Sequence, residues 1–171
     1  MYLEGKDWSR YTADFKSSAF RLELHSVYDM AGEREEFERF LSGERPPADL
    51  SYPWLDKVAN GVRAGKSFQR VHVVRRPLSD YLRYEFEWGY AFNVKAGEDV
   101  RILDLTGKPD PGLPDHDFWL FDDATIVRML YRFDGAQIGR ELIENPNIVE
   151  YEHYKSAALK DSVPFTEYWQ S

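Results

Sequence analysis

The segment HDFWLFDD, residues 116–123, has a histidine at its start and two carboxylates at its end. Histidine can act as a nucleophile or exchange a proton near neutral pH, and a carboxylate can support it in either role. His116 and Asp123 are therefore candidate catalytic residues. The alternative is that the segment is a buried strand with acidic ends.

Arg70, His72 and Arg101 form a second candidate group, in two predicted strands. If these strands are neighbours, the three side chains can project from one face and bind a small anion through charge-assisted hydrogen bonds. The alternative is structural, because glutamates that are close in sequence can pair with the same arginines. Those glutamates are Glu85, Glu87 and Glu98.

Signals for a metal or a cofactor are weak. Glu150 and His153 form one E-x-x-H motif, whereas a carboxylate-bridged metal pair needs two such motifs and two further glutamates. The chain has neither a Gly-rich phosphate loop nor a G-x-S-x-G turn. It has no cysteine, which excludes thiolate ligands, cysteine nucleophiles and disulfides. We therefore predict no metal and no cofactor.

The charge balance argues against direct nucleic-acid binding. The chain has 22 basic and 30 acidic residues, and its net charge of −8 repels a phosphate backbone. No segment approaches the roughly 18 apolar residues of a membrane span, and the first residues lack the apolar run of a signal peptide. We expect a cytoplasmic protein that does not contact membranes, folded as a single domain over residues 1–171.

Alternating apolar and polar residues predict six strands. These cover residues 18–30, 67–77, 98–105, 117–123, 125–133 and 136–143. In the first, Phe20 and Leu22 alternate with Arg21 and Glu23, which predicts one buried face. The Asp134-Gly135 dipeptide predicts a hairpin between the last two strands.

Apolar residues at three- and four-residue spacing predict helices at residues 32–43, 51–66, 77–97 and 145–163. Strands that first alternate with helices and then form a meander predict a single mixed sheet with helices packed on it, in the α/β or α+β class. Five residues of the later strands are expected to face one helix-covered side. They are Phe118, Leu120, Val127, Met129 and Tyr131.

The spacing of His116 and Asp123 resembles the His-x-Lys-x4-Asp motif of phospholipase-D-type phosphodiesterases, and the order of predicted elements is similar to their half-domain. The resemblance implies a phospholipase-D-like topology, with His116 as nucleophile, Asp123 in support, and Arg70 or Arg101 in place of the motif's lysine. Phe118 occupies the lysine position, and the chain has one motif where those enzymes use two. Losing a positive charge removes a principal stabilisation of a phosphoryl transition state, so this reading implies a degenerate phosphodiesterase or nuclease.

A second resemblance covers nearly the whole chain. RVHVVRRPLSDYLRYEF, NVKAGEDVRILD, DFWLFDDATIVRMLY and KSAALKDSVPF resemble an uncharacterised actinobacterial domain family, encoded beside helix-turn-helix regulators, in which the position of His116 varies. This resemblance implies a non-enzymatic regulatory or partner-binding module in a bacterial transcription-linked system. Its implied partners are a basic helix-turn-helix regulator, which an acidic surface suits, and a small anionic ligand. The remaining alternative is an effector paired with a neighbouring regulator.

Overall fold

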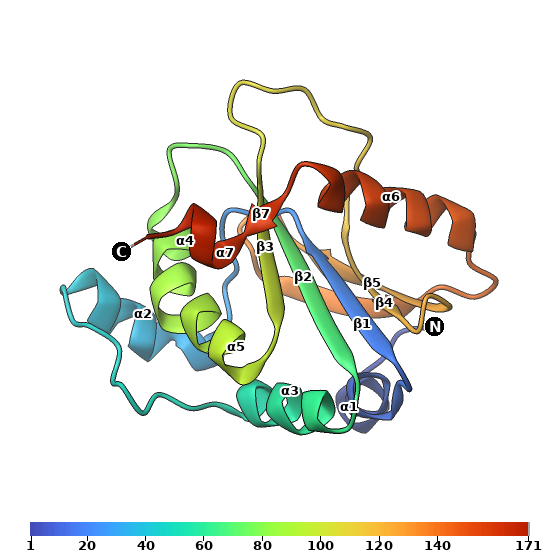
Figure 1. The fold of residues 1–171 in the computed structure, drawn as a ribbon, viewed down its shortest axis with the longest axis horizontal. Helices are drawn as coiled ribbons and strands as arrows, with labels where there is room; N and C mark the ends of the chain where they lie inside the picture. The colour runs from blue at the N-terminus through green and yellow to red at the C-terminus, as the bar shows by residue number, and fades with distance from the viewer. Residues whose placement is uncertain (171) are drawn as a thin grey trace.

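A seven-stranded mixed sheet forms the centre of the protein (Figure 1). The computed structural model describes residues 1–170. The strands are β1 (Ser18–Glu23), β2 (Ser67–Val74), β3 (Asp99–Asp104), β4 (Asp117–Phe121), β5 (Thr125–Tyr131), β6 (Gln137–Leu142) and β7 (Val163–Pro164). Their order is β6-β5-β4-β1-β2-β3-β7, in which β1, β2 and β3 are parallel and the other pairs are antiparallel. The predicted mixed sheet is confirmed, as is the hairpin at Asp134-Gly135 between β5 and β6.

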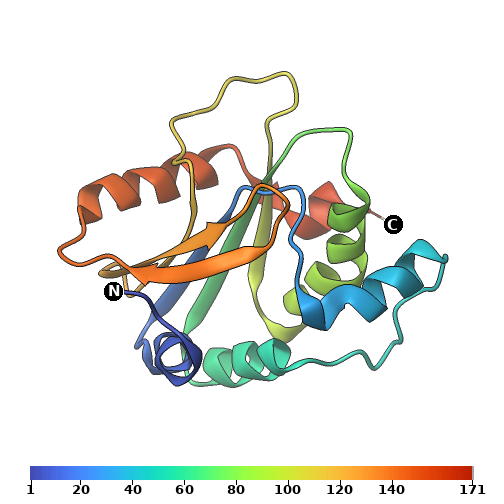
Figure 2. The ribbon, with the colours of Figure 1, turned by 180° about the vertical axis from the view of Figure 1, so that it is seen from behind.

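Helices cover both faces of this sheet. They are α1 (Gly5–Asp14), η1 (Ala31–Glu33), α2 (Arg34–Leu41), α3 (Pro53–Arg63), α4 (Asp80–Glu85), η2 (Phe86–Tyr90), α5 (Ala91–Ala96), α6 (Ile148–Lys160) and α7 (Phe165–Tyr168). α6 lies on one face, and α1 and α3 lie on the opposite side of the strands with the α4–α5 segment (Figures 1 and 2). We call this second side the helix-rich face. None of these helices is both long and apolar enough to cross a membrane.

Strand β4 is buried on both faces, because it lies between β1 and β5 with helices on either side. Phe118 and Leu120 pack in the core under α6, whereas Trp119 packs on the helix-rich face. The three-residue turn after β4 pairs Trp119 with Val127, so that Val127 and Met129 also point to the helix-rich face. The prediction of one shared face is therefore wrong for the five residues that it named: Phe118, Leu120, Val127, Met129 and Tyr131.

The helix predicted at residues 77–97 is divided by a π-helical turn, η2. Ser79 begins α4, since its hydroxyl accepts a hydrogen bond from the Leu82 backbone N at 3.1 Å, and Gly97 ends α5 with a φ of 112°. The wider turn rotates the chain between α4 and α5, and Trp88 and Tyr90 are both buried there. Such turns occur frequently at functional sites, and η2 supplies part of the site described below.

The sequence patterns do not predict α1, β7 or α7. The Trp8 ring of α1 lies 6.3 Å from that of Trp119, and Phe15 lies 5.2 Å from Phe68, so α1 closes the core at one end of the helix-rich face. At the other end, Phe165 of α7 packs in the cluster beside η2. Both terminal segments therefore complete the same side of the sheet.

Candidate functional site

Charged side chains project from the sheet into the helix-rich face, where apolar residues are the rule. Arg21 of β1 lies opposite Arg70 of β2, and Glu23 lies opposite His72 two residues further along. Arg21 and Glu23 are each 4% exposed, and His72 is fully buried. The predicted single buried face of the first strand is therefore wrong, since its polar face is buried as well.

Arg70 is held between two carboxylates. Its Nη1 donates to Glu23 Oε1 over 2.6 Å, and its Nη2 donates to Glu98 Oε1 over 3.1 Å. Burial alone would raise the pKa of Glu23, but the Arg70 charge, aided by His72 and Arg21, lowers it to about 2. The structural alternative stated for Arg70 and Glu98 is thus confirmed, and the positive charge of Arg70 is compensated on both sides.

His72 lies at the centre of the buried polar group. Its Nε2 is 2.7 Å from the carbonyl oxygen of His25 and donates to it, while its Nδ1 is 2.8 Å from the Tyr90 hydroxyl. That hydroxyl also lies 2.8 Å from Glu23 Oε1, and its single proton can be donated to either of these two acceptors. Burial lowers the pKa of His72 against the opposing charge of Glu23, which favours a neutral imidazole at neutral pH.

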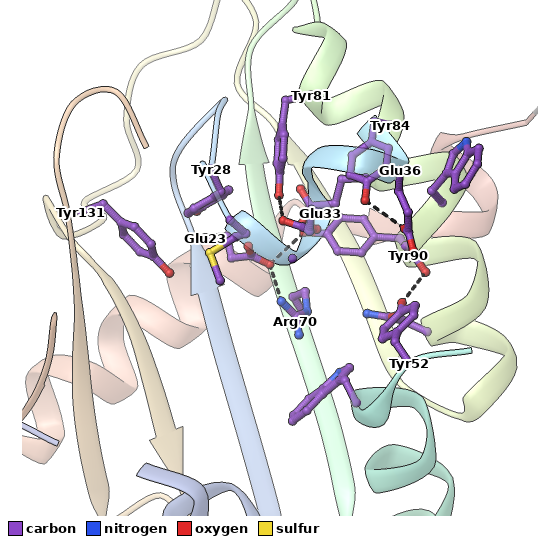
Figure 3. Close-up of a pocket in the computed structure, with 17 residues that line it drawn as sticks. Glu23, Tyr28, Glu33, Glu36, Tyr52, Arg70, Tyr81, Tyr84, Tyr90 and Tyr131 are labelled. Carbon is purple, nitrogen blue, oxygen red and sulfur yellow. Dashed lines mark hydrogen bonds and ion pairs between the residues drawn. The ribbon is translucent and has the colours of Figure 1, made fainter. Parts of the chain in front are cut away.

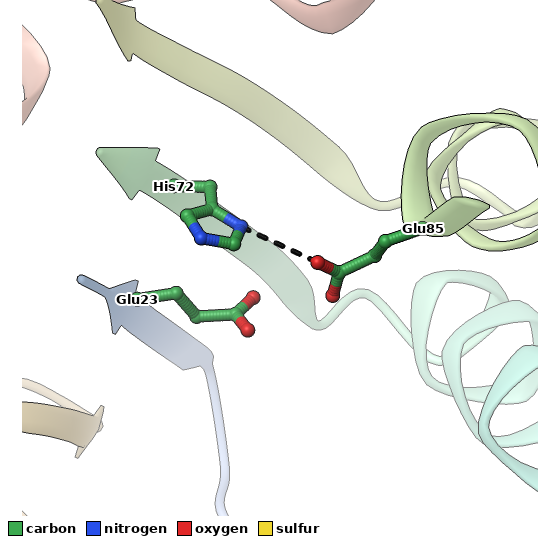
Figure 4. Close-up of side chains that lie close together, drawn as sticks. All are labelled: Glu23, His72 and Glu85. Carbon is green, nitrogen blue, oxygen red and sulfur yellow. Dashed lines mark ion pairs between the residues drawn. The ribbon is translucent and has the colours of Figure 1, made fainter. Parts of the chain in front are cut away.

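Glu85 faces His72 without a hydrogen bond of its own (Figure 4). Its Oε2 lies 3.5 Å from His72 Nδ1 and has no hydrogen-bond partner among residues 1–170. Burial raises the pKa of Glu85 well above its ordinary value, and the charges of Glu23 and Glu33 raise it further, which favours the protonated carboxyl group. Glu23, His72 and Glu85 bring potential metal ligands within 4.8 Å of one another. Charge balance does not require a metal there, because Arg70 already compensates Glu23.

Asp117 forms a second buried ion pair on the same face. Its Oδ2 accepts hydrogen bonds from Arg21 Nη2 over 3.2 Å and from the Tyr28 hydroxyl over 2.5 Å. Its Oδ1 accepts the backbone N–H of Leu24 over 2.9 Å. The fully buried carboxylate therefore ties β4 to β1 and to the segment that follows β1.

A pocket of about 450 Å³ opens beside these ion pairs (Figure 3). Six tyrosines, two tryptophans and four glutamates line it, and we call it the tyrosine–glutamate pocket. Tyr81 donates to Glu33 over 2.9 Å, and Tyr84 donates to Glu36 over 3.2 Å. Burial raises the pKa of Glu33 to about 7, although the hydrogen bond from Tyr81 lowers it. The pocket thus contains a carboxyl group that titrates near neutral pH.

Arg101 lies on the opposite face from Arg70 and His72. Arg101 is the register partner of Val71, and Val71 packs in the core under α6. Arg101 therefore points to the face that α6 covers. Its Nε donates to Ser162 Oγ over 2.8 Å. The structure therefore does not bring Arg70, His72 and Arg101 together, because strand pairing assigns them to two faces of the sheet. Whether any of them binds a ligand stays a prediction.

His116 and Asp123 also lie apart, at opposite ends of β4. The five intervening strand residues span about 16 Å. His116 Nε2 lies 2.8 Å from the Tyr151 hydroxyl, whereas Asp123 pairs with Lys155 at 3.1 Å. Two side chains so placed cannot act together on one reacting group.

We expect His116→Ala to lower the free energy of unfolding by about 1 kcal/mol, because the partly exposed histidine loses its hydrogen bonds to Tyr151 and to the exposed Asp115, and its ring lies only at the edge of the core beside Phe118. Thermal unfolding measures this change. Neither the wild type nor the variant is expected to hydrolyse bis-nitrophenyl phosphate. Hydrolysis by the wild type that the substitution abolishes at an unchanged melting temperature would contradict the second expectation and favour the phosphodiesterase reading.

Most acidic residues of the site were missed by sequence analysis, which interpreted the charged positions of the first strand as its solvent face. A pattern in two neighbouring strands could have predicted this burial. RLE in β1 and RVH in β2 place basic and acidic side chains side by side, where they can neutralise one another. Glu33 and Glu36 stood out less, because a highly charged helix such as α2 normally exposes its glutamates.

The fold and the site together define a mixed α/β domain with an ion-paired polar core beneath an acidic pocket lined by aromatic residues. The chain belongs to the family described as Domain of unknown function (DUF6879), whose family model matches residues 6–170. None of the curated proteins matches the sequence significantly. The family match agrees with the predicted membership of an uncharacterised domain family.

Proposed function

We propose that this protein is a non-enzymatic binding module that accepts a positively charged group of a partner in the tyrosine–glutamate pocket. One observation carries the proposal: Arg70, the one arginine or lysine among the described lining residues, is already compensated by Glu23 and Glu98. The charge left for a ligand is therefore that of Glu33 and Glu36.

The aromatic lining supports the same choice of ligand. Tyrosine and tryptophan rings attract cations through their π faces, by about 0.5–2 kcal/mol for each close contact. Trp88 already has the Arg39 guanidinium 5.2 Å from its ring centroid, which illustrates this preference within the chain. A volume of about 450 Å³ lies in the usual range for small-ligand sites and accommodates an arginine or lysine side chain.

The partner that we propose is a basic helix-turn-helix regulator in a cytoplasmic, transcription-linked system of a bacterium, as the resemblance to the actinobacterial family implies. The net charge of −8 supports a basic partner, because complementary fields accelerate association and set its orientation. In this proposal the pocket receives one arginine or lysine side chain of that regulator. Mass spectrometry of proteins that copurify with the chain from its host tests the identity of the partner.

The affinity for N-acetyl-arginine amide is expected to increase with pH. Glu33, with a pKa of about 7, is largely protonated at pH 6 and largely ionised at pH 8, and only the carboxylate attracts the guanidinium. From pH 6 to pH 8 the ionised fraction rises from about 10% to about 90%, so the dissociation constant should fall by up to roughly ninefold. Isothermal titration calorimetry at both pH values measures the change.

Three controls accompany this titration. N-acetyl-citrulline amide has the shape of the arginine compound without its charge and is expected to bind at least tenfold more weakly. Glu33→Gln should remove the pH dependence. Glu36→Gln should weaken binding, whereas Glu35→Gln, an exposed position on the same helix, should not. Equal binding of the two compounds, or equal effects of Glu35→Gln and Glu36→Gln, would rule out this pocket as a cation site.

A further inference from the structure

We propose a second binding site, for a small oxyanion, in a smaller pocket on the helix-rich face. It is lined by four cations: Arg21, Lys57, Arg70 and Arg140. Its volume is about 250 Å³, and no aspartate or glutamate belongs to its lining within residues 1–170. We call it the arginine–tryptophan pocket. It is independent of the proposed function, although four residues line both pockets: Met30, Trp54, Arg70 and Tyr131.

Arg21 provides a buried donor without an acceptor. Its side chain is 5% exposed, and its Nη2 donates to Asp117 and to the Tyr131 hydroxyl. Its Nη1 is buried and has no hydrogen-bond partner among the described residues. A buried guanidinium N–H without an acceptor is costly, and an oxygen atom of a bound ligand would remove that cost.

Arg140 provides a second such donor. It lies beside Met129 in the β5–β6 pairing and therefore points to the helix-rich face. Its Nε is buried and has no hydrogen-bond partner within residues 1–170. Burial lowers the pKa of Arg140, and the charge of Arg21 lowers it further against the opposing effect of Tyr131. An anion between Arg21 and Arg140 would be attracted by both guanidinium groups and would offset the repulsion between them.

Lys57 adds a third cation from α3. Its ammonium group donates to Thr12 Oγ1 over 2.7 Å, which uses one of its three N–H groups and leaves its charge without a carboxylate in the described chain. Arg70, by contrast, is compensated by Glu23 and Glu98. The uncompensated charge of the pocket therefore resides on Lys57 and Arg140.

Tryptophan rings form the walls between these cations. Arg140 lies 5.1 Å from the ring centroid of Trp8, Arg21 lies 5.7 Å from Trp119, and Lys57 lies 6.0 Å from Trp54. Three donors beside flat apolar walls suit an oxyanion attached to a small aromatic or apolar group. The volume restricts the ligand to the size of a simple carboxylate or phosphate monoester.

Titrations with benzoate, phenyl phosphate and inorganic phosphate test this inference, with the indole N–H resonances of the protein followed by NMR. Benzoate or phenyl phosphate should give saturable shifts, and their relative affinities distinguish a carboxylate from a phosphate. Benzamide, which has the shape of benzoate without its charge, should not bind. Inorganic phosphate alone is expected to bind more weakly than phenyl phosphate, because it lacks the ring that contacts the tryptophans.

Arg140→Gln should weaken oxyanion binding at least about tenfold, which corresponds to about 1.4 kcal/mol. Arg128→Gln is the matched control: it removes the same charge from the neighbouring strand, but it points to the opposite face beside Phe118. Lys57→Gln is a second test should Arg140→Gln fail to fold. Arg140→Gln and Lys57→Gln should both retain binding of N-acetyl-arginine amide. A failure of the oxyanion proposal can therefore be distinguished from a failure of the cation proposal for the tyrosine–glutamate pocket. Equal shifts with benzamide, an absence of saturation with every oxyanion, or equal weakening by Arg128→Gln would overturn the inference.

Discussion

Replacing Glu23 with Gln is expected to lower the free energy of unfolding by about 3 kcal/mol. The substitution keeps the size of the side chain but removes the charge that the Arg70 guanidinium contacts at 2.6 Å. Glu98 remains as the second partner of Arg70, which places the loss at the lower end of the range for breaking a buried pair. The side chains of Arg70 and Glu23 are only 12% and 5% exposed, so water cannot replace the lost partner.

Urea and thermal unfolding measure this loss, which corresponds to a decrease in melting temperature of roughly 6–12 °C for a chain of this length. The pKa of Glu23 is about 2 in the folded protein against an ordinary value of 4.5. Its stabilising contribution is therefore complete above about pH 4.5 and is lost as the pH falls through about 2. The difference between wild type and variant should shrink over that range. A difference that is independent of pH would show that Gln disturbs packing instead of removing a charge.

Glu85→Gln is the matched control. Glu85 belongs to the same cluster, but burial raises its pKa and so favours the protonated carboxyl group, and no hydrogen bond to its Oε2 is formed within residues 1–170. The neutral amide should therefore change the free energy of unfolding by less than about 1 kcal/mol at pH 7. A loss as large as that of Glu23→Gln would show that Glu85 is ionised in the folded protein.

The elements of the sheet were predictable from alternation, but the burial of their faces was not. Alternating polarity shows that Phe20 and Arg21 point to opposite sides, yet it does not show what covers each side. Arg21 is buried because a partner carboxylate on β4 and helices far away in sequence reach it. For the same reason the prediction that Phe118 and Val127 share a face was wrong. The three-residue turn between β4 and β5 determines which residues of β5 lie on the face of Phe118, and alternation alone does not give its length.

The site was predictable in part. Arg70 and its pairing with Glu98 could be inferred from sequence proximity, and the π-helical turn that brings Glu85 and Tyr90 toward His72 could not. The separation of His116 from Asp123 follows from strand geometry once the segment between them is read as extended. α1 was missed although Trp8, Tyr11 and Thr12 have helical spacing, because its sequence is otherwise polar.

The first and last aspartates of the segment HDFWLFDD, Asp117 and Asp123, are expected to differ sharply in their contribution to stability. Asp117→Asn should lower the free energy of unfolding by about 3–5 kcal/mol. The carboxylate is fully buried, and donors from Arg21, Tyr28 and the Leu24 backbone converge on its two oxygens. An amide offers one acceptor oxygen, so its NH2 group must face at least one of these donors and leave it unpaired.

Asp123→Asn is the control at the other end of β4, and it should change stability by less than about 0.5 kcal/mol. Asp123 makes one ion pair with Lys155 in which its own side chain is 54% exposed, and its positive φ of 51° is one that asparagine also adopts readily. Urea unfolding of the two variants at pH 7 gives the comparison. Similar losses for both would contradict the assignment of Asp117 as the interior carboxylate. A large loss for Asp117→Asn alone would show that Asp117, and not Asp123, stabilises the ion-paired core. The contacts of His116 and Asp123 lie outside that core, with Tyr151 and Lys155.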